Sequence, residues 1–194
     1  MQMHATKKLL IERGLQMLLE QGYNSLGLQS LLEAAGVPKG SFYHHFADKE
    51  DFALQVIDAY IESVHETLDA CVSDGGLAPL DRIRAFFVRV EKSYANEGYL
   101  GCLMGGLGQE LSGVNSTFRD KIDRCLSSIA DRLRICLDAA RADGTIPHDH
   151  DTRIMADLLV DCWEGAALRS RLKRSPAPLS AMLGFYLDSI SSPP

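Results

Sequence analysis

The sequence predicts an all-α fold, and three observations lead to this expectation. Apolar residues recur at spacings of three and four along almost the whole chain, as they do on one face of an α-helix. No stretch shows the alternation of apolar and polar residues that is typical of a half-buried strand. Glycine and proline fall mainly between the periodic segments, where they end or start helices. Together these signals predict about nine helices.

The first three helices are expected to be short and closely spaced. An amphipathic helix occupies the start of the chain and ends at Gly22, and a second helix over residues 28–35 ends at Gly36. Glycine favours such ends because it adopts the left-handed conformation without steric cost. A third helix is expected over residues 39–46, after Pro38, since proline suits the turn or the first helical position.

The third helix has two distinct faces. Phe42 and Phe46 lie four residues apart and can anchor one face to a core. The remaining polar, basic and aromatic positions lie on or beside the other face: Lys39, Gly40, Ser41, Tyr43, His44 and His45. A buried stripe with hydrogen-bond donors and aromatic rings opposite it is what a recognition helix in a DNA groove requires.

The rest of the chain continues the helical pattern. Asp48 is a suitable N-cap for a long helix that ends near Val72, before the break Ser73-Asp-Gly-Gly. Further helices are expected over about 80–96, inside the glycine-dense segment 97–113, from about 118 to a stop at Gly144, and over about 152–172 and 178–190. The helix–turn–helix thus occupies residues 1–47, and residues 48–194 form a second, all-helical part of the chain.

Composition limits the function classes. Apolar residues make up 46% and charged residues 24% of the 194 residues, which is typical of a globular chain. No apolar run approaches the roughly 20 residues that a bilayer crossing needs, and the first 25 residues do not resemble a signal peptide, so a cytoplasmic protein without a membrane partner is expected. The net charge of −6 argues against a generally basic nucleic-acid binder, so any DNA contact must come from a local patch.

Metal, cofactor and disulfide chemistry are not expected. The five cysteines form no CxxC spacing, and Cys125, Cys136 and Cys162 lie inside apolar helical patterns where a thiol acts as a small hydrophobe. The run His148-Asp-His-Asp151 offers four possible metal ligands. It directly precedes a helix, however, where aspartate caps the N-terminus, so a solvated turn is the favoured interpretation.

Cys102 is the candidate for ligand or sensor chemistry. It lies among glycines, at or just ahead of a short helix, and a helix N-terminus stabilises a thiolate. A small buried hydrophobe is the alternative, and it is favoured. Five further side chains could line an apolar pocket or simply form core: Phe87, Tyr94, Met104, Phe118 and Trp163. A thiol-dependent enzyme using Cys102 is the rival function, although no histidine offers a convincing partner base.

The N-terminal segment resembles a known family. Ala34-Ala-Gly-Val37, the run Lys39–Phe46 and Lys49-Glu50 are similar to the DNA-binding domain of the tetracycline-repressor (TetR) family, most sharply over about residues 8–55. The resemblance implies a helix–turn–helix DNA-binding domain over residues 1–47 and a helical ligand-binding and dimerisation domain over residues 48–194. It further implies a homodimer that binds palindromic operator DNA and dimerises through its last two helices, about 152–172 and 178–190. Gly27 stands where the family often has a Ser or Thr cap, and His45 stands where it usually has tyrosine.

The resemblance also implies roles for individual residues. The six outer residues of the third helix would face the groove, and Lys49 would contact a phosphate. Gly101-Cys102-Leu103, with Pro38–Phe42, is similar to the branch that contains the N-ethylmaleimide-reductase repressor, which responds to reactive electrophiles through cysteine. The sequence therefore predicts a transcriptional repressor, not an enzyme, that a small molecule or an electrophile releases from DNA.

Overall fold

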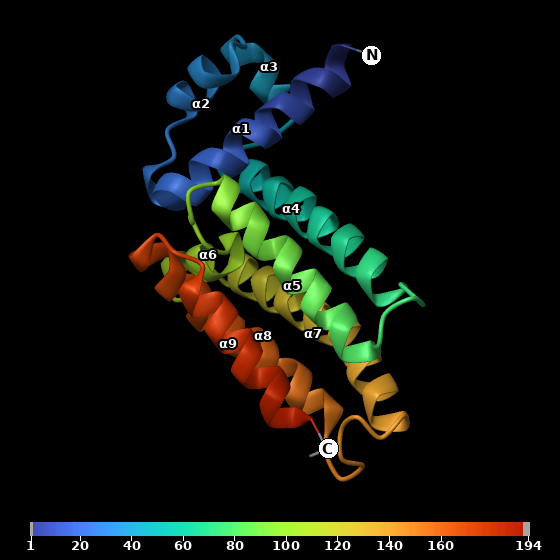
Figure 1. Ribbon diagram of the computed structural model, residues 1–194. Coiled ribbons are helices and arrows are strands. Elements are labelled where there is room, and N and C mark those ends of the chain that lie inside the picture. Colours follow the sequence, from blue (N-terminus) through green and yellow to red (C-terminus); the bar gives the residue numbers. More distant parts are fainter. Residues whose placement is uncertain (1, 192–194) are drawn as a thin grey trace. The chain divides into compact units, whose positions relative to one another are not determined.

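The computed structural model describes residues 2–191, and over this range the chain forms nine α-helices and no strand (Figure 1). The predicted all-α fold is confirmed. The helices are α1 (Gln2–Ser25), α2 (Leu28–Ala35), α3 (Lys39–Tyr43), α4 (Lys49–Val72), α5 (Pro79–Asn96), α6 (Leu103–Leu111), α7 (Ser116–Ala142), α8 (Thr152–Lys173) and α9 (Ala177–Ile190). None of these described helices has the length and apolarity that crossing a membrane would require.

The chain packs as two compact units. One unit comprises the chain up to Ser63 together with Leu103–Ile122, and the other comprises Val64–Cys102 and the chain from Asp123 onward. Helices α4 and α7 therefore each contribute residues to both units. These units describe how the chain packs. The boundary at residue 47, between a DNA-binding and a ligand-binding domain, stays a prediction.

Three phenylalanine rings form the centre of the first unit. Phe42 and Phe46 are fully buried, as the spacing predicted, and their ring centroids lie 5.0 Å apart. Phe52 of α4 lies 5.4 Å from Phe42 and 4.9 Å from Phe46, so the rings of α3 and α4 pack as one cluster. A Cβ at Gly14 would lie 2.2 Å from the Phe52 ring, which shows how closely α1 approaches it.

The predicted helix ends of the first unit are confirmed. Helix α1 is interrupted at Gly22, where φ is 78°, and α2 ends at Gly36 with φ of 64°. Gly27 occupies the N-cap of α2 without a side-chain hydrogen bond. Asp48 caps α4, because its carboxylate accepts the Asp51 N–H at 2.8 Å, and the Asp51 carboxylate accepts the Ala47 N–H at 2.9 Å.

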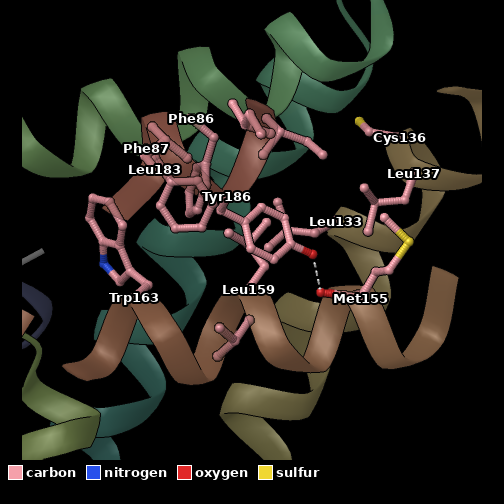
Figure 2. Close-up of a cluster of buried hydrophobic side chains, with 14 of the residues drawn as sticks. Phe86, Phe87, Leu133, Cys136, Leu137, Met155, Leu159, Trp163, Leu183 and Tyr186 are labelled. Atoms are coloured by element: carbon pink, nitrogen blue, oxygen red, sulfur yellow. Dashed lines mark hydrogen bonds between the residues drawn. The ribbon is translucent and has the colours of Figure 1, made fainter. Parts of the chain in front are cut away.

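The second unit has its own hydrophobic core, shown in Figure 2. Trp163 of α8 lies against Phe87 of α5, with ring centroids 4.3 Å apart. The Tyr186 hydroxyl of α9 donates a hydrogen bond to the backbone carbonyl of Met155 in α8, and burial raises the pKa of Tyr186 above its usual range. Helices α8 and α9 are consecutive and pack side by side.

Three cysteines lie in apolar helical patterns, but the structure buries only Cys125 and Cys136, whereas the Cys162 side chain is exposed in the single chain. Leu158, one turn earlier on α8, is 50% exposed. Both belong to a second apolar face of α8, and hydrophobic periodicity does not say which of two such faces a single chain covers.

Candidate nucleic-acid interface

Helix α3 is short and firmly anchored. Pro38 is its N-cap, with φ of −69°, and the Pro38 carbonyl accepts the Ser41 N–H at 2.9 Å. The helix ends at Tyr43, three residues before the expected end. Phe46 nonetheless donates its N–H to the Phe42 carbonyl at 3.0 Å, and both rings remain buried. The turn that follows Tyr43 therefore preserves both anchors of the expected helix.

The outer face of α3 is open to solvent. Tyr43 is 54% exposed, and its ring meets the Phe42 ring edge-on at 5.3 Å. The structure brings all six predicted residues together on this segment, some exposed (Lys39, Gly40, Tyr43, His44) and some partly buried (Ser41, His45). The His45 ring lies 6.0 Å from the Phe46 ring. Donors of hydrogen bonds and an aromatic ring are thus presented on a rigid support.

Lys49 has intramolecular partners in this structure. Its Nζ lies 4.6 Å from the centre of the Tyr23 ring and 3.5 Å from the Asn24 carbonyl oxygen, and it is half-buried at the start of α4. Burial lowers the pKa of Lys49, and the charge of Glu110 opposes that shift. The contact of Lys49 with a DNA phosphate stays a prediction, and the structure shows a second role for the same ammonium group.

The segment before Cys102 has an unusual backbone. Gly98, Tyr99 and Gly101 all have positive φ, of 72°, 58° and 85°, and this conformation is uncommon for a residue such as Tyr99. Arg174, beyond the end of α8, donates a hydrogen bond of 2.6 Å to the Gly98 carbonyl. Helix α6 then begins directly after Cys102, as the sequence predicted.

Glu164 is the residue near Cys102 that sequence reasoning missed. The half-buried Cys102 thiol donates a hydrogen bond to the Glu164 carboxyl of α8. Burial raises the pKa of Glu164 to about 6, the thiol hydrogen bond lowers it, and the charge of Asp161 raises it further. No local pattern signals this pair, because the two residues come from segments far apart in the chain. The arrangement holds the thiol proton against a carboxyl group.

The structure separates the other candidate ligand residues into two groups. Phe87, Tyr94 and Trp163 lie together in the second unit, with Tyr94 and Trp163 ring centroids 6.4 Å apart. Met104 and Phe118 belong to the first unit, where the Phe118 ring lies 5.1 Å from the Tyr23 ring of α1. All five candidate side chains are buried and contribute to the cores.

The acidic and histidine-rich turn before α8 acts as a cap. The Asp151 carboxylate accepts the N–H groups of Arg153 at 2.9 Å and Ile154 at 3.3 Å, which confirms the predicted capping role. Among the residues that the structure describes, no group of three or more His, Cys, Asp and Glu side chains is placed to hold a metal ion. The five cysteines are free thiols.

A short helix anchored by two buried rings, preceded by a glycine-capped helix and a tight turn, defines a helix–turn–helix DNA-binding protein. Residues 10–56 match the family model described as bacterial regulatory proteins, tetR family. Residues 79–184 match the model described as Tetracyclin repressor-like, C-terminal domain. The chain belongs to the TetR family of bacterial transcriptional regulators.

Known members of the family are similar over most of the chain. The transcriptional regulator AcuR of Cereibacter sphaeroides is 42% identical over 171 residues, 88% of this chain and 78% of AcuR. A crystal structure of the regulatory protein TetR from Rhodobacter sphaeroides superposes with a TM-score of 0.89 at 40% identity, covering 93% of this chain and 96% of that one. The reduced form of Escherichia coli NemR superposes with a TM-score of 0.85 at 28% identity, covering 97% of this chain and 98% of NemR.

Proposed function

We propose that this regulator is a ligand-responsive repressor that binds a near-palindromic operator as a homodimer in the cytoplasm. Helix α3 of each subunit would lie in the major groove of one half-site. The observation that supports this most directly is the two-sided character of α3, in which buried Phe42 supports an exposed face around Tyr43. The repressor NemR of Escherichia coli, 29% identical over 191 residues, supports the direction of regulation.

The chemistry of the α3 face suits duplex DNA. Lys39 can donate to a guanine edge or a phosphate, and the hydroxyl groups of Ser41 and Tyr43 can donate to phosphate oxygens. His44 and His45 add ring nitrogens to the same face. A Cβ at Gly40 would meet nothing within 4 Å, so this side of α3 is open and the DNA backbone could approach it closely.

The homodimer would form through α8 and α9. Large apolar side chains on these two helices are exposed in the single chain: Ile154, Leu158, Leu168, Leu172 and Phe185. On α8 they recur at helical spacing, and on α9 the small residues Ala181 and Gly184 lie beside Phe185. Single exposed apolar residues are common on protein surfaces, whereas several on two adjacent helices indicate a contact surface. A second copy of the chain would cover this surface by an isologous contact, in which both subunits use the same face. Two subunits also double the DNA contacts, which offsets the acidic net charge.

The effector would be a small molecule or an electrophile acting at the region of Cys102. The glycine-rich backbone before Cys102 and the hydrogen bond of its thiol to Glu164 support a role for this site. A hundredfold release of DNA requires about 3 kcal/mol of coupling between effector and operator binding. The relatives reported above are transcriptional regulators, and no observation favours the enzyme alternative, so we attach no catalytic turnover to Cys102.

Operator binding tests this proposal directly. A palindrome from the DNA beside the coding region would be titrated with the purified protein in fluorescence anisotropy. Lys39→Ala is expected to weaken binding about tenfold. Lys173→Ala, which removes the same charge from an exposed site on α8, is expected to bind as the wild type does. Equal affinities for the two variants would contradict the placement of α3 in the groove.

A cysteine substitution separates the two effector classes. If an electrophile acts at this residue, Cys102→Ser binds the operator normally but is not released by N-ethylmaleimide. If a non-covalent ligand acts instead, the variant responds to that ligand as the wild type does. Cys162→Ser is the control for the loss of a different thiol, because Cys162 belongs to α8 and not to the loop before α6.

A further inference from the structure

The Glu110 carboxylate of α6 makes a bidentate contact with the backbone of α1. One carboxylate oxygen accepts the Tyr23 N–H at 2.8 Å, and the other accepts the Asn24 N–H at 2.7 Å. These two N–H groups follow the break at Gly22, so they resemble the unpaired donors at the start of a helix. Hydrogen bonds from such donors to a carboxylate are charge-assisted and therefore stronger than those between neutral groups.

The local sequence is suited to this contact. A Cβ at Gly22 would lie 2.5 Å from the Glu110 carboxylate, so glycine leaves the space that the carboxylate needs. The Lys49 Nζ of α4 lies 4.6 Å from the centre of the Tyr23 ring. The Phe118 ring of α7 also packs against Tyr23, with the two ring centroids 5.1 Å apart. The end of α1 is thus held by α4, α6 and α7 at once, and Glu110 supplies the hydrogen bonds to its backbone.

Helix α6 packs with the DNA-binding helices although it lies far from them in sequence. Leu103–Ile122 belong to the same unit as α1, α2 and α3, whereas the segment that ends at Cys102 belongs to the other unit. The chain passes between the units within α4, within α7 and at the peptide bond between Cys102 and Leu103. Cys102 is therefore bonded directly to the first residue of α6.

We propose that Glu110 is the positioning residue through which α6 holds the DNA-binding helices in the operator-binding arrangement. The proposal rests on the function proposed above, and it assigns to the Glu110 side chain the task of fixing the end of α1. A shift of α6 would withdraw the Glu110 carboxylate from Tyr23 and Asn24 and free the end of α1. Since α1 packs against α3, the recognition helix then loses its fixed position.

The test compares Glu110→Gln with a charge-matched control. Glutamine keeps the length of the side chain but replaces one acceptor oxygen with an amide donor, which cannot accept an N–H. Glu20→Gln removes the same charge from an exposed site on α1, where the Gln16 side chain one turn earlier donates a hydrogen bond to the Glu20 carboxylate. Operator affinity is measured for both variants and the wild type, before and after treatment with N-ethylmaleimide, alongside thermal unfolding and amide exchange of Tyr23 and Asn24.

The expected result is specific to Glu110. Untreated Glu110→Gln binds the operator about tenfold more weakly than the wild type, loses protection of the two amides, and unfolds at nearly the wild-type temperature. N-ethylmaleimide weakens operator binding by about a hundredfold for the wild type but by less than about tenfold for Glu110→Gln, because the variant has already lost the contact with Tyr23 and Asn24. Glu20→Gln behaves as the wild type.

Other outcomes overturn the proposal. Equal operator affinity for all three proteins overturns the anchor, while the DNA-binding function stands. The same loss in Glu20→Gln attributes the effect to charge alone and also overturns it. If N-ethylmaleimide does not release the wild type, the electrophile effector fails, and the untreated affinities alone decide on the anchor.

Discussion

Replacing Glu164 with glutamine is expected to stabilise the protein at neutral pH but not in acid. Burial raises the pKa of this carboxyl from 4.5 to about 6, so the folded state prefers the protonated form. The ionised group therefore destabilises the folded state, and this penalty grows as the pH rises through the range between those two values. Since one pKa unit corresponds to about 1.4 kcal/mol, the full penalty is about 2 kcal/mol above pH 6. Glutamine carries no charge, and its carbonyl can still accept the Cys102 hydrogen bond.

The assay is urea unfolding of the wild type and Glu164→Gln at several pH values and at one fixed protein concentration. The difference in the free energy of unfolding is expected to be near zero at pH 4 and to rise to about 2 kcal/mol in favour of the variant at pH 7.5. Glu66→Gln removes an exposed carboxylate from the same unit and serves as the control. A difference that is constant across pH, or that favours the wild type at pH 7.5, would refute the reasoning.

Three further substitutions test other parts of the molecule. Phe42→Ala should lower the free energy of unfolding by about 3–5 kcal/mol in urea titrations, because its ring is fully buried, whereas Tyr43→Ala beside it should cost under about 1 kcal/mol. Leu172→Asp should shift the dimer toward monomer in sedimentation, and Val88→Asp, at an exposed apolar site on α5, should not. Lys49→Ala should reduce the salt dependence of operator binding by about one phosphate contact, and an unchanged slope would assign this ammonium to Tyr23 alone.

Local signals explain how much of the fold the sequence could predict. The ends at Gly22 and Gly36 and the caps at Asp48 and Asp151 depend on residues within one helical turn, and the structure confirms each of them. The burial of Phe42 follows equally from its spacing, since a four-residue interval sets two side chains on one helix face. Such features need no knowledge of which distant segments meet.

The contacts around the candidate site could not be predicted in this way. Cys102 with Glu164, and Glu110 with Tyr23, join segments whose separation in the chain leaves no periodic trace. The exposure of Cys162 shows a related limit. An apolar stripe predicts burial, but burial by the same chain and burial by a second copy produce the same spacing.

The placement of α6 changes which substitutions should affect DNA binding. By sequence, the glycine-dense segment 97–113 belongs to the expected ligand-binding domain, and residues 1–47 form the expected DNA-binding domain. By packing, Leu103–Ile122 form one unit with that helix, and Glu110 contacts α1 by two hydrogen bonds. Because α6 starts at the residue after Cys102, the shortest covalent path from the candidate sensor to the DNA-binding unit is a single peptide bond.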